Sequence, residues 1–180
     1  MRIAVEGCLH GELEQVYQQL LAVQEKTATP IDALIICGDI QSLRNYSDLE
    51  DMHCPDKYKS MGTFIDYYEG RKKAPLLTIL IGGNHEAVNS LRESYFGGWL
   101  APNIYYLGQT GSVLLRKGGQ CLRVTGASGI FKSNDFKYTT RLERYPLKGK
   151  DKITAYHSKQ LDLLRLELLA RISTMQKAQP

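Results

Sequence analysis

Three short polar motifs in this chain carry residue types that bind metal ions or transfer protons. They are Gly7-Cys8-Leu9-His10-Gly11, Gly38-Asp39-Ile40-Gln41 and Gly82-Gly83-Asn84-His85-Glu86. Thiolate, imidazole, carboxylate and amide groups are all ligands for divalent cations, and glycines let the backbone turn tightly beside an ion. Taken singly, each motif has a plain structural explanation as a small buried cysteine, a structural histidine or a turn. Their joint occurrence predicts a metal site.

Each motif directly follows an apolar stretch that is typical of a β-strand. The predicted strands are Arg2–Glu6, Ile31–Cys37 and Leu76–Ile81, and a helix over Gly11–Glu25 separates the first two. Alternation of strands and helices predicts an α/β domain with a largely parallel central sheet. Ligands of such sheets collect beyond the carboxyl ends of the strands, which is where the three motifs fall.

Four residues are the candidate metal ligands. Cys8 and His10 are two residues apart in an extended turn and can converge on one cation. Asp39 has two oxygens and can bridge two cations, and Asn84 offers a neutral oxygen to the second. The thiolate and the imidazole favour zinc or iron, whereas the oxygen ligands would also accept manganese. We therefore expect one or two divalent ions.

The remainder of the chain shows weaker patterns. Further elements are predicted as helices at Ser47–Met52 and Tyr58–Tyr68, a hairpin of Ser112–Arg116 and Gln120–Thr125, and a helix at Ile153–Met175 with Leu161, Leu164, Leu168 and Ile172 on one face. In the segment Lys132–Lys152 the apolar residues recur with no clear helical or strand period. No internal repeat or linker divides the chain, so its 180 residues form one domain.

Composition excludes several classes of protein. Apolar residues make up 43% and charged residues 23%, as in ordinary globular domains. No apolar run is long enough to span a bilayer, and the first residues do not resemble a secretory signal. Four irregularly spaced cysteines favour free thiols in a reducing compartment over a disulfide framework.

Charge is distributed unevenly. Residues 1–90 hold 8 Lys/Arg against 13 Asp/Glu, a net of −5, whereas residues 91–180 hold 15 against 6, a net of +9. An acidic half suits metal cations, and a basic half suits a polyanion such as nucleic acid. The alternative is an ordinary drift of surface charge along the chain.

The order of the three motifs resembles the opening of the calcineurin-like metallophosphoesterase signature, with Gly38-Asp39 and Asn84-His85 in the matching places. Most of that superfamily has Asp where this chain has Cys8, and the Gly-Cys-x-His-Gly turn resembles the RNA lariat debranching enzymes. Tyr67-Tyr68-Glu69-Gly70 and Ser128-Gly129-Ile130-Phe131-Lys132 are also similar to that family. The likeness covers almost all of residues 1–132. It implies the metallophosphoesterase fold, in which β-sheets are sandwiched by helices.

The resemblance implies metal-dependent hydrolysis of the 2′-5′ phosphodiester at the branch point of excised intron lariat RNA, a step of mRNA processing. In related enzymes the residue matching His85 faces the leaving oxygen, so His85 is the candidate general acid. Glu86 is expected to cap the following helix rather than to orient His85. The suggested substrate implies a nuclear location, and an additional cytoplasmic location stays open.

The segment 132–152 is the candidate RNA-recognition loop, because it interleaves cations with aromatic side chains. The candidate RNA-binding residues are Lys132, Lys137, Tyr138, Arg141 and Arg144. A solvated surface loop anchored by its aromatics is the alternative.

The superfamily pattern also requires later histidines, and the only histidine after His85 is His157. His157 is expected to be a surface or packing residue of a helix rather than a ligand. We therefore expect residues 1–180 to be the N-terminal part of one metallophosphoesterase domain, incomplete at the C-terminus, with a partial metal site. Two other functions stay open: a general metallophosphodiesterase acting on a small or nucleotide substrate, and a branched-RNA-binding module that does not cut.

Overall fold

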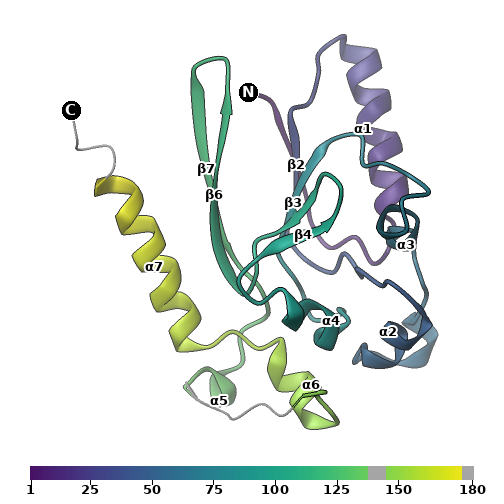
Figure 1. Cartoon of the computed structure of the whole chain (residues 1–180), viewed down its shortest axis with the longest axis vertical. Helices are drawn as coiled ribbons and strands as arrows, with labels where there is room; N and C mark the ends of the chain where they lie inside the picture. Colours follow the sequence, from purple (N-terminus) through teal and green to yellow (C-terminus); the bar gives the residue numbers. More distant parts are fainter. Residues whose placement is uncertain (138–144, 176–180) are drawn as a thin grey trace.

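The computed structural model describes residues 1–137 and 145–175, with side chains described as far as residue 171. Its centre is a five-stranded sheet in the order β1-β2-β3-β5-β4 (Figure 1). The strands are β1 (Ile3–Glu6), β2 (Ala33–Ile36), β3 (Leu77–Leu80), β4 (Gly98–Ala101) and β5 (Ile104–Tyr106). The first four in sheet order are parallel, and β4 is an antiparallel edge strand. The predicted α/β class and parallel sheet are confirmed.

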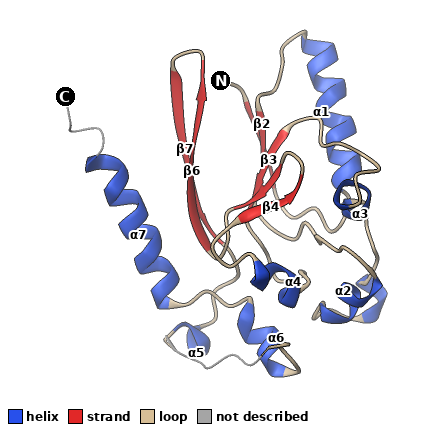
Figure 2. Ribbon diagram, viewed as in Figure 1, coloured by secondary structure: helices blue, strands red, loops and turns tan. Residues whose placement is uncertain are grey.

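Helices flank this sheet and gather at one end of it (Figure 2). They are α1 (Leu13–Thr27), α2 (Tyr46–Asp51), α3 (Phe64–Tyr68), α4 (Val88–Glu93), α5 (Ser133–Phe136), α6 (Lys150–Ala155) and α7 (Gln160–Met175), with a 3₁₀ turn at Asp56–Tyr58. Within the described ranges, no helix is both long and apolar enough to cross a bilayer.

The core explains why the central strands form where the apolar runs lie. Leu34 and Ile36 of β2 and Leu80 of β3 are fully buried, together with Leu13 and Tyr17 of α1. Burial on both faces requires continuous apolar residues, which is the pattern these strands show in the sequence. Burial of each such side chain stabilises the fold by roughly 1.5–3 kcal/mol.

A long hairpin lies beside the sheet and forms a second, two-stranded sheet. Its strands are β6 (Thr110–Lys117) and β7 (Gln120–Ala127), each longer than the sequence predicts. Helix α7 contacts both strands and runs alongside them (Figure 1). Asp162 in its first turn is buried and accepts hydrogen bonds from the side chain of Gln109 and from the backbone N–H of Lys159, at 3.2 and 2.8 Å. This carboxylate ties the start of α7 to the hairpin.

Two sequence predictions about helices are wrong in part. Residues 59–63 are not helical, because the chain turns at Gly62 with φ 58° before α3 begins. The predicted helix at 153–175 is broken between α6 and α7, where His157 pairs with Ile130 in an isolated β-bridge. His157 is buried but lies in this break, with its Nδ1 2.5 Å from Oδ2 of Asp135.

The leucine stripe of α7 is not a buried face. Leu161, Leu164 and Leu168 are 43–51% exposed. The described side chains that turn toward the protein from this helix include Asp162 and the half-buried Leu166. The side chain of Ile172 lies outside the described residues.

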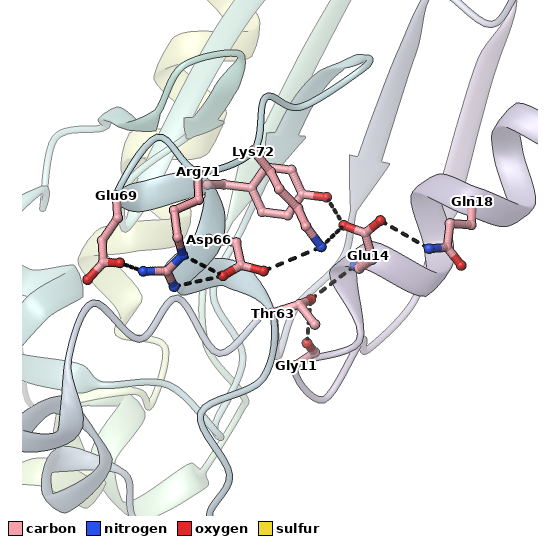
Figure 3. Close-up of polar contacts among 9 residues, drawn as sticks. Gly11, Glu14, Gln18, Thr63, Asp66, Glu69, Arg71 and Lys72 are labelled. Atoms are coloured by element: carbon pink, nitrogen blue, oxygen red, sulfur yellow. Dashed lines mark hydrogen bonds and ion pairs between the residues drawn. The ribbon is translucent and has the colours of Figure 1, made fainter.

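A polar network fastens α1 to α3 at the first polar turn of the chain (Figure 3). Thr63 Oγ1 donates to the carbonyl of Gly11 at 3.1 Å and accepts from the backbone N–H of Glu14 at 3.0 Å. Hydrogen bonds from the Tyr67 hydroxyl, at 2.6 Å, and from Lys72, at 3.0 Å, hold the pKa of Glu14 below its ordinary value. This network fixes the chain immediately after the motif that contains Cys8 and His10.

Candidate metal centre

The parallel register of β1, β2 and β3 brings the three polar motifs to one edge of the sheet. The backbone N–H of His10 donates to the carbonyl of Asp39 at 2.8 Å, so the first two motifs are joined directly. The backbone N–H of His85 donates to Oδ1 of Asp39 at 2.8 Å, which joins the third. Asp39 is therefore the residue on which the three motifs meet.

Three non-glycine residues at this edge adopt left-handed backbone conformations. They are His10, Asp39 and Gln41, with φ of 49°, 47° and 55°. Such conformations cost about 1 kcal/mol or more for L-residues and collect at functional sites. Here they turn the side chains of His10 and Asp39 into the same space.

A sulfur, a nitrogen and an oxygen converge in that space. The ligand atoms of Cys8, His10 and Asp39 all lie within 4.8 Å of one another. Atoms bound to one zinc ion at about 2.0–2.3 Å are no more than about 4.6 Å apart. A small adjustment of exposed Cys8 and His10 lets all three hold one cation, so the donor set fits a divalent metal.

His85 lies against this cluster. Its Nδ1 is 3.4 Å from Nδ1 of His10 and 3.5 Å from Oδ2 of Asp39, and about a quarter of its side chain is exposed. Asn84, in the same turn, is half-buried. The structure thus brings Cys8, His10, Asp39 and His85 together. The ligand roles of Cys8, His10, Asp39 and Asn84 and the catalytic role of His85 stay predictions.

Partial desolvation and the carboxylate of Asp39 raise the pKa of the Cys8 thiol above its ordinary 9.0. Cys8 therefore carries a proton at neutral pH in the metal-free protein. A cation bound to sulfur must displace that proton, so its affinity should rise with pH.

Glu86 has a role that sequence reasoning missed. It does not cap α4, since the residue at that helix's N-cap is Ala87, with no side-chain cap. Its buried carboxylate accepts from the backbone N–H groups of Ile40 and Gln41 at 2.9 and 3.0 Å. Glu86 therefore holds the turn that presents Asp39. The sequence around Glu86 does not predict these hydrogen bonds, because their donors lie more than 40 residues away in the chain.

Burial, reinforced by the charge of Asp39, raises the pKa of Glu86 from 4.5 to about 8. In the metal-free protein the folded state thus binds more protons than the unfolded state between these values, so its free energy of unfolding falls as pH rises from 4.5 to about 8. We expect urea denaturation in the presence of a chelator to show this slope.

Glu86→Gln should flatten that slope, whereas Glu25→Gln, at an exposed position of α1, should leave it unchanged. An identical pH profile for wild type and Glu86→Gln would contradict the raised pKa.

The candidate RNA-binding residues divide into two groups. Lys132 and Lys137 are exposed at either end of α5. Tyr138, Arg141 and Arg144 lie outside the described residues. The expectation that residues 1–180 are the N-terminal part of one metallophosphoesterase domain, with an RNA-recognition loop at 132–152, therefore stays a prediction.

Comparison with known proteins identifies the family of this chain. The model of the family "Calcineurin-like phosphoesterase" matches residues 1–166. The chain is 47% identical to lariat debranching enzyme A of Xenopus laevis and 46% identical to the lariat debranching enzyme of Homo sapiens, in each case over 94% of its own length. The Danio rerio enzyme is 48% identical over 93%. The chain spans only 28–31% of the length of these relatives. By the match to residues 1–166, the chain belongs to the calcineurin-like phosphoesterase family.

Proposed function

We propose that this chain forms the metal-binding part of an enzyme that hydrolyses the 2′-5′ phosphodiester of branched, lariat RNA. The observation that carries the proposal is the Cys8–His10–Asp39 cluster. It lies within the region that is 46–48% identical to lariat debranching enzymes. Such a role would place the protein where introns are processed, in the nucleus.

Cys8, His10 and Asp39, with Asn84 as the fourth ligand, would hold one or two ions of iron, zinc or manganese. A bound divalent cation supplies a water molecule of lowered pKa and neutralises charge on the phosphate. The protein's own residues contribute by holding the reacting groups in place. Asp39 receives the backbone N–H of His85 and so fixes where that imidazole lies.

His85 is the proposed general acid. Its ring borders the cluster and is partly exposed, so a substrate can reach it. In the proposed reaction the imidazole gives its proton to the departing 2′-oxygen, and the products are a 2′-hydroxyl and a 5′-phosphate. General acid catalysis contributes about 10²–10⁴-fold to the rate.

The test compares three substrates in the presence of Mn²⁺: branched RNA, linear RNA of the same sequence, and a small chromogenic diester. Of the two RNAs, only the branched RNA should be cleaved, at a rate reduced by the partial metal site that the sequence predicts. His85→Ala should lower that rate by about 10²–10⁴-fold. His53→Ala, at an exposed position outside the cluster, should retain the rate.

Equal cleavage of linear RNA or of the diester would identify a general phosphodiesterase instead. Tight binding of branched RNA without cleavage would identify a binding module.

Lys132 and Lys137 are proposed to contact phosphates of the RNA. Each such contact with single-stranded nucleic acid contributes about 0.7 to the slope of log K against log salt. Replacing both by Ala should therefore reduce the slope by about 1.4 while hydrolysis of the small diester is unchanged. Replacing exposed Lys26 and Lys57 is the control. An unchanged slope in the Lys132/Lys137 variant would place the RNA elsewhere.

A further inference from the structure

A separate pocket opens between the loop after Asp39, helices α3 and α4, and strand β4. Its volume is about 150 Å³. Its wall includes Ser42, Arg44, Tyr68, Glu93 and Trp99. None of these is a candidate ligand of the metal centre, and none takes part in the proposed reaction.

Two aromatic side chains border the pocket while remaining largely exposed. Trp99 is 61% exposed and Tyr68 is 47% exposed. The Trp99 ring is held in place by an edge contact with Tyr105, with ring centroids 5.0 Å apart. Exposed, fixed aromatic rings beside a hollow are suited to stacking against a planar ligand, and nucleobases are the planar groups that proteins hold in this way.

The charges of the wall argue against a phosphate. The guanidinium of Arg44 is already paired, with Nε 3.0 Å from Asp48 and Nη1 2.8 Å from Glu93. These two carboxylates outnumber the one cation, and the Glu93 side chain is 63% exposed. Only Glu93 of the two lines the pocket, and both of its oxygens accept from Arg44, at 2.8 and 3.3 Å. Because a carboxylate oxygen can accept a second hydrogen bond, the wall favours a neutral ligand that donates hydrogen bonds, such as an amino group.

Ser42 supplies an independent sign of a ligand. The residue is only 2% exposed, and its Oγ has no hydrogen-bond partner among the residues that the structure describes. Leaving a buried hydroxyl unpaired costs free energy, which a polar ligand in the pocket would recover.

We propose that this pocket binds a single nucleobase that carries an exocyclic amino group, from a nucleotide close to the scissile phosphate. Ser42 follows Asp39 by three residues, so the chain places its Cα at most about 11 Å from the Cα of Asp39. The base would stack on Trp99 and Tyr68, with its amino group on Glu93 and a ring or exocyclic atom on Ser42. As an RNA subsite, the assignment rests on the proposed function.

Trp99 is the only tryptophan of the chain, so its fluorescence reports this pocket alone. The whole chain is titrated with AMP, CMP, UMP and ribose 5-phosphate, without added metal. AMP and CMP should change the emission with saturation, and ribose 5-phosphate should not. UMP should bind about tenfold more weakly, since uracil cannot donate an amino hydrogen bond to a carboxylate.

Tyr68→Ala and Ser42→Ala should each weaken AMP binding by at least about fivefold, as expected for loss of a stacking or hydrogen-bonding partner. Phe96→Ala removes a more exposed aromatic outside the pocket and is the matched control. No saturable change, equal binding of ribose 5-phosphate, or unchanged affinity in Tyr68→Ala and Ser42→Ala would overturn the proposal. Because the titration requires neither metal nor cleavage, its result is independent of whether branched RNA is hydrolysed.

Discussion

Asp39→Asn is expected to weaken the binding of a divalent cation by more than about 100-fold. The substitution removes the negative charge of the residue on which all three motifs meet, while its amide oxygen can still accept from the backbone N–H of His85. Removing a group that only hydrogen-bonds to a metal ligand lowers metal affinity by roughly 10–100-fold, so removing an anionic ligand itself should lower it further. Competition for Zn²⁺ against a chromophoric chelator measures the change.

Asp56→Asn is the matched control. That carboxylate is 94% exposed and pairs only with nearby Lys59 among the described residues, so the same change of charge should leave Zn²⁺ affinity unaltered. Equal affinity for Zn²⁺ in wild type and Asp39→Asn, with both proteins folded, would show that the ion binds elsewhere. A similar loss in both variants would show only a long-range effect of net charge.

The strands that carry the metal centre could be predicted because each forms from an apolar run within its own sequence. The apolar runs around Ile35 and Ile79 are what a strand buried on both faces requires, and the polar motifs that follow them necessarily meet at one edge of a parallel sheet. Cys8, His10 and Asp39 are therefore found by order and residue type alone. Their distances are set by backbone turns that residue type does not specify.

The sequence predictions are wrong where a contact between residues far apart in the sequence determines the local structure. Glu86 looks like a helix cap because it precedes α4, yet burial beside Ile40 makes it a support for the Asp39 turn. The break before α7 follows from the bridge between Ile130 and His157, which the leucine period across residues 153–175 cannot reveal. The leucine period does predict a helix, but in α7 the leucine side is exposed, contrary to the usual rule that the apolar stripe of a helix faces the core.

The glycines of the third motif show a constraint that only the folded structure makes visible. A Cβ placed on Gly83 would lie 2.0 Å from Oδ1 of Asp39 and 2.8 Å from that residue's backbone nitrogen. Neither atom can move freely, since the carboxylate receives the backbone N–H of His85 and the backbone belongs to the turn. The absent side chain is thus what allows the second and third motifs to touch.

Gly83→Ala is therefore expected to lower the free energy of unfolding by about 1–3 kcal/mol, the usual cost of forcing extra atoms into a packed site. It should also weaken Zn²⁺ binding by at least about tenfold, because Asp39 must be displaced. Urea denaturation and chelator competition measure the two effects on the same protein.

Gly7→Ala provides the comparison, because a Cβ there would have no atom within 4 Å and that glycine has no left-handed backbone conformation. It lies in the neighbouring motif, one residue before Cys8, so it should change stability by no more than about 0.5 kcal/mol. If Gly83→Ala were as stable as Gly7→Ala and bound Zn²⁺ equally well, the close contact between the two motifs would be wrong. If Gly83→Ala lost stability but kept Zn²⁺ affinity, Asp39 would not be the ligand on which the site depends.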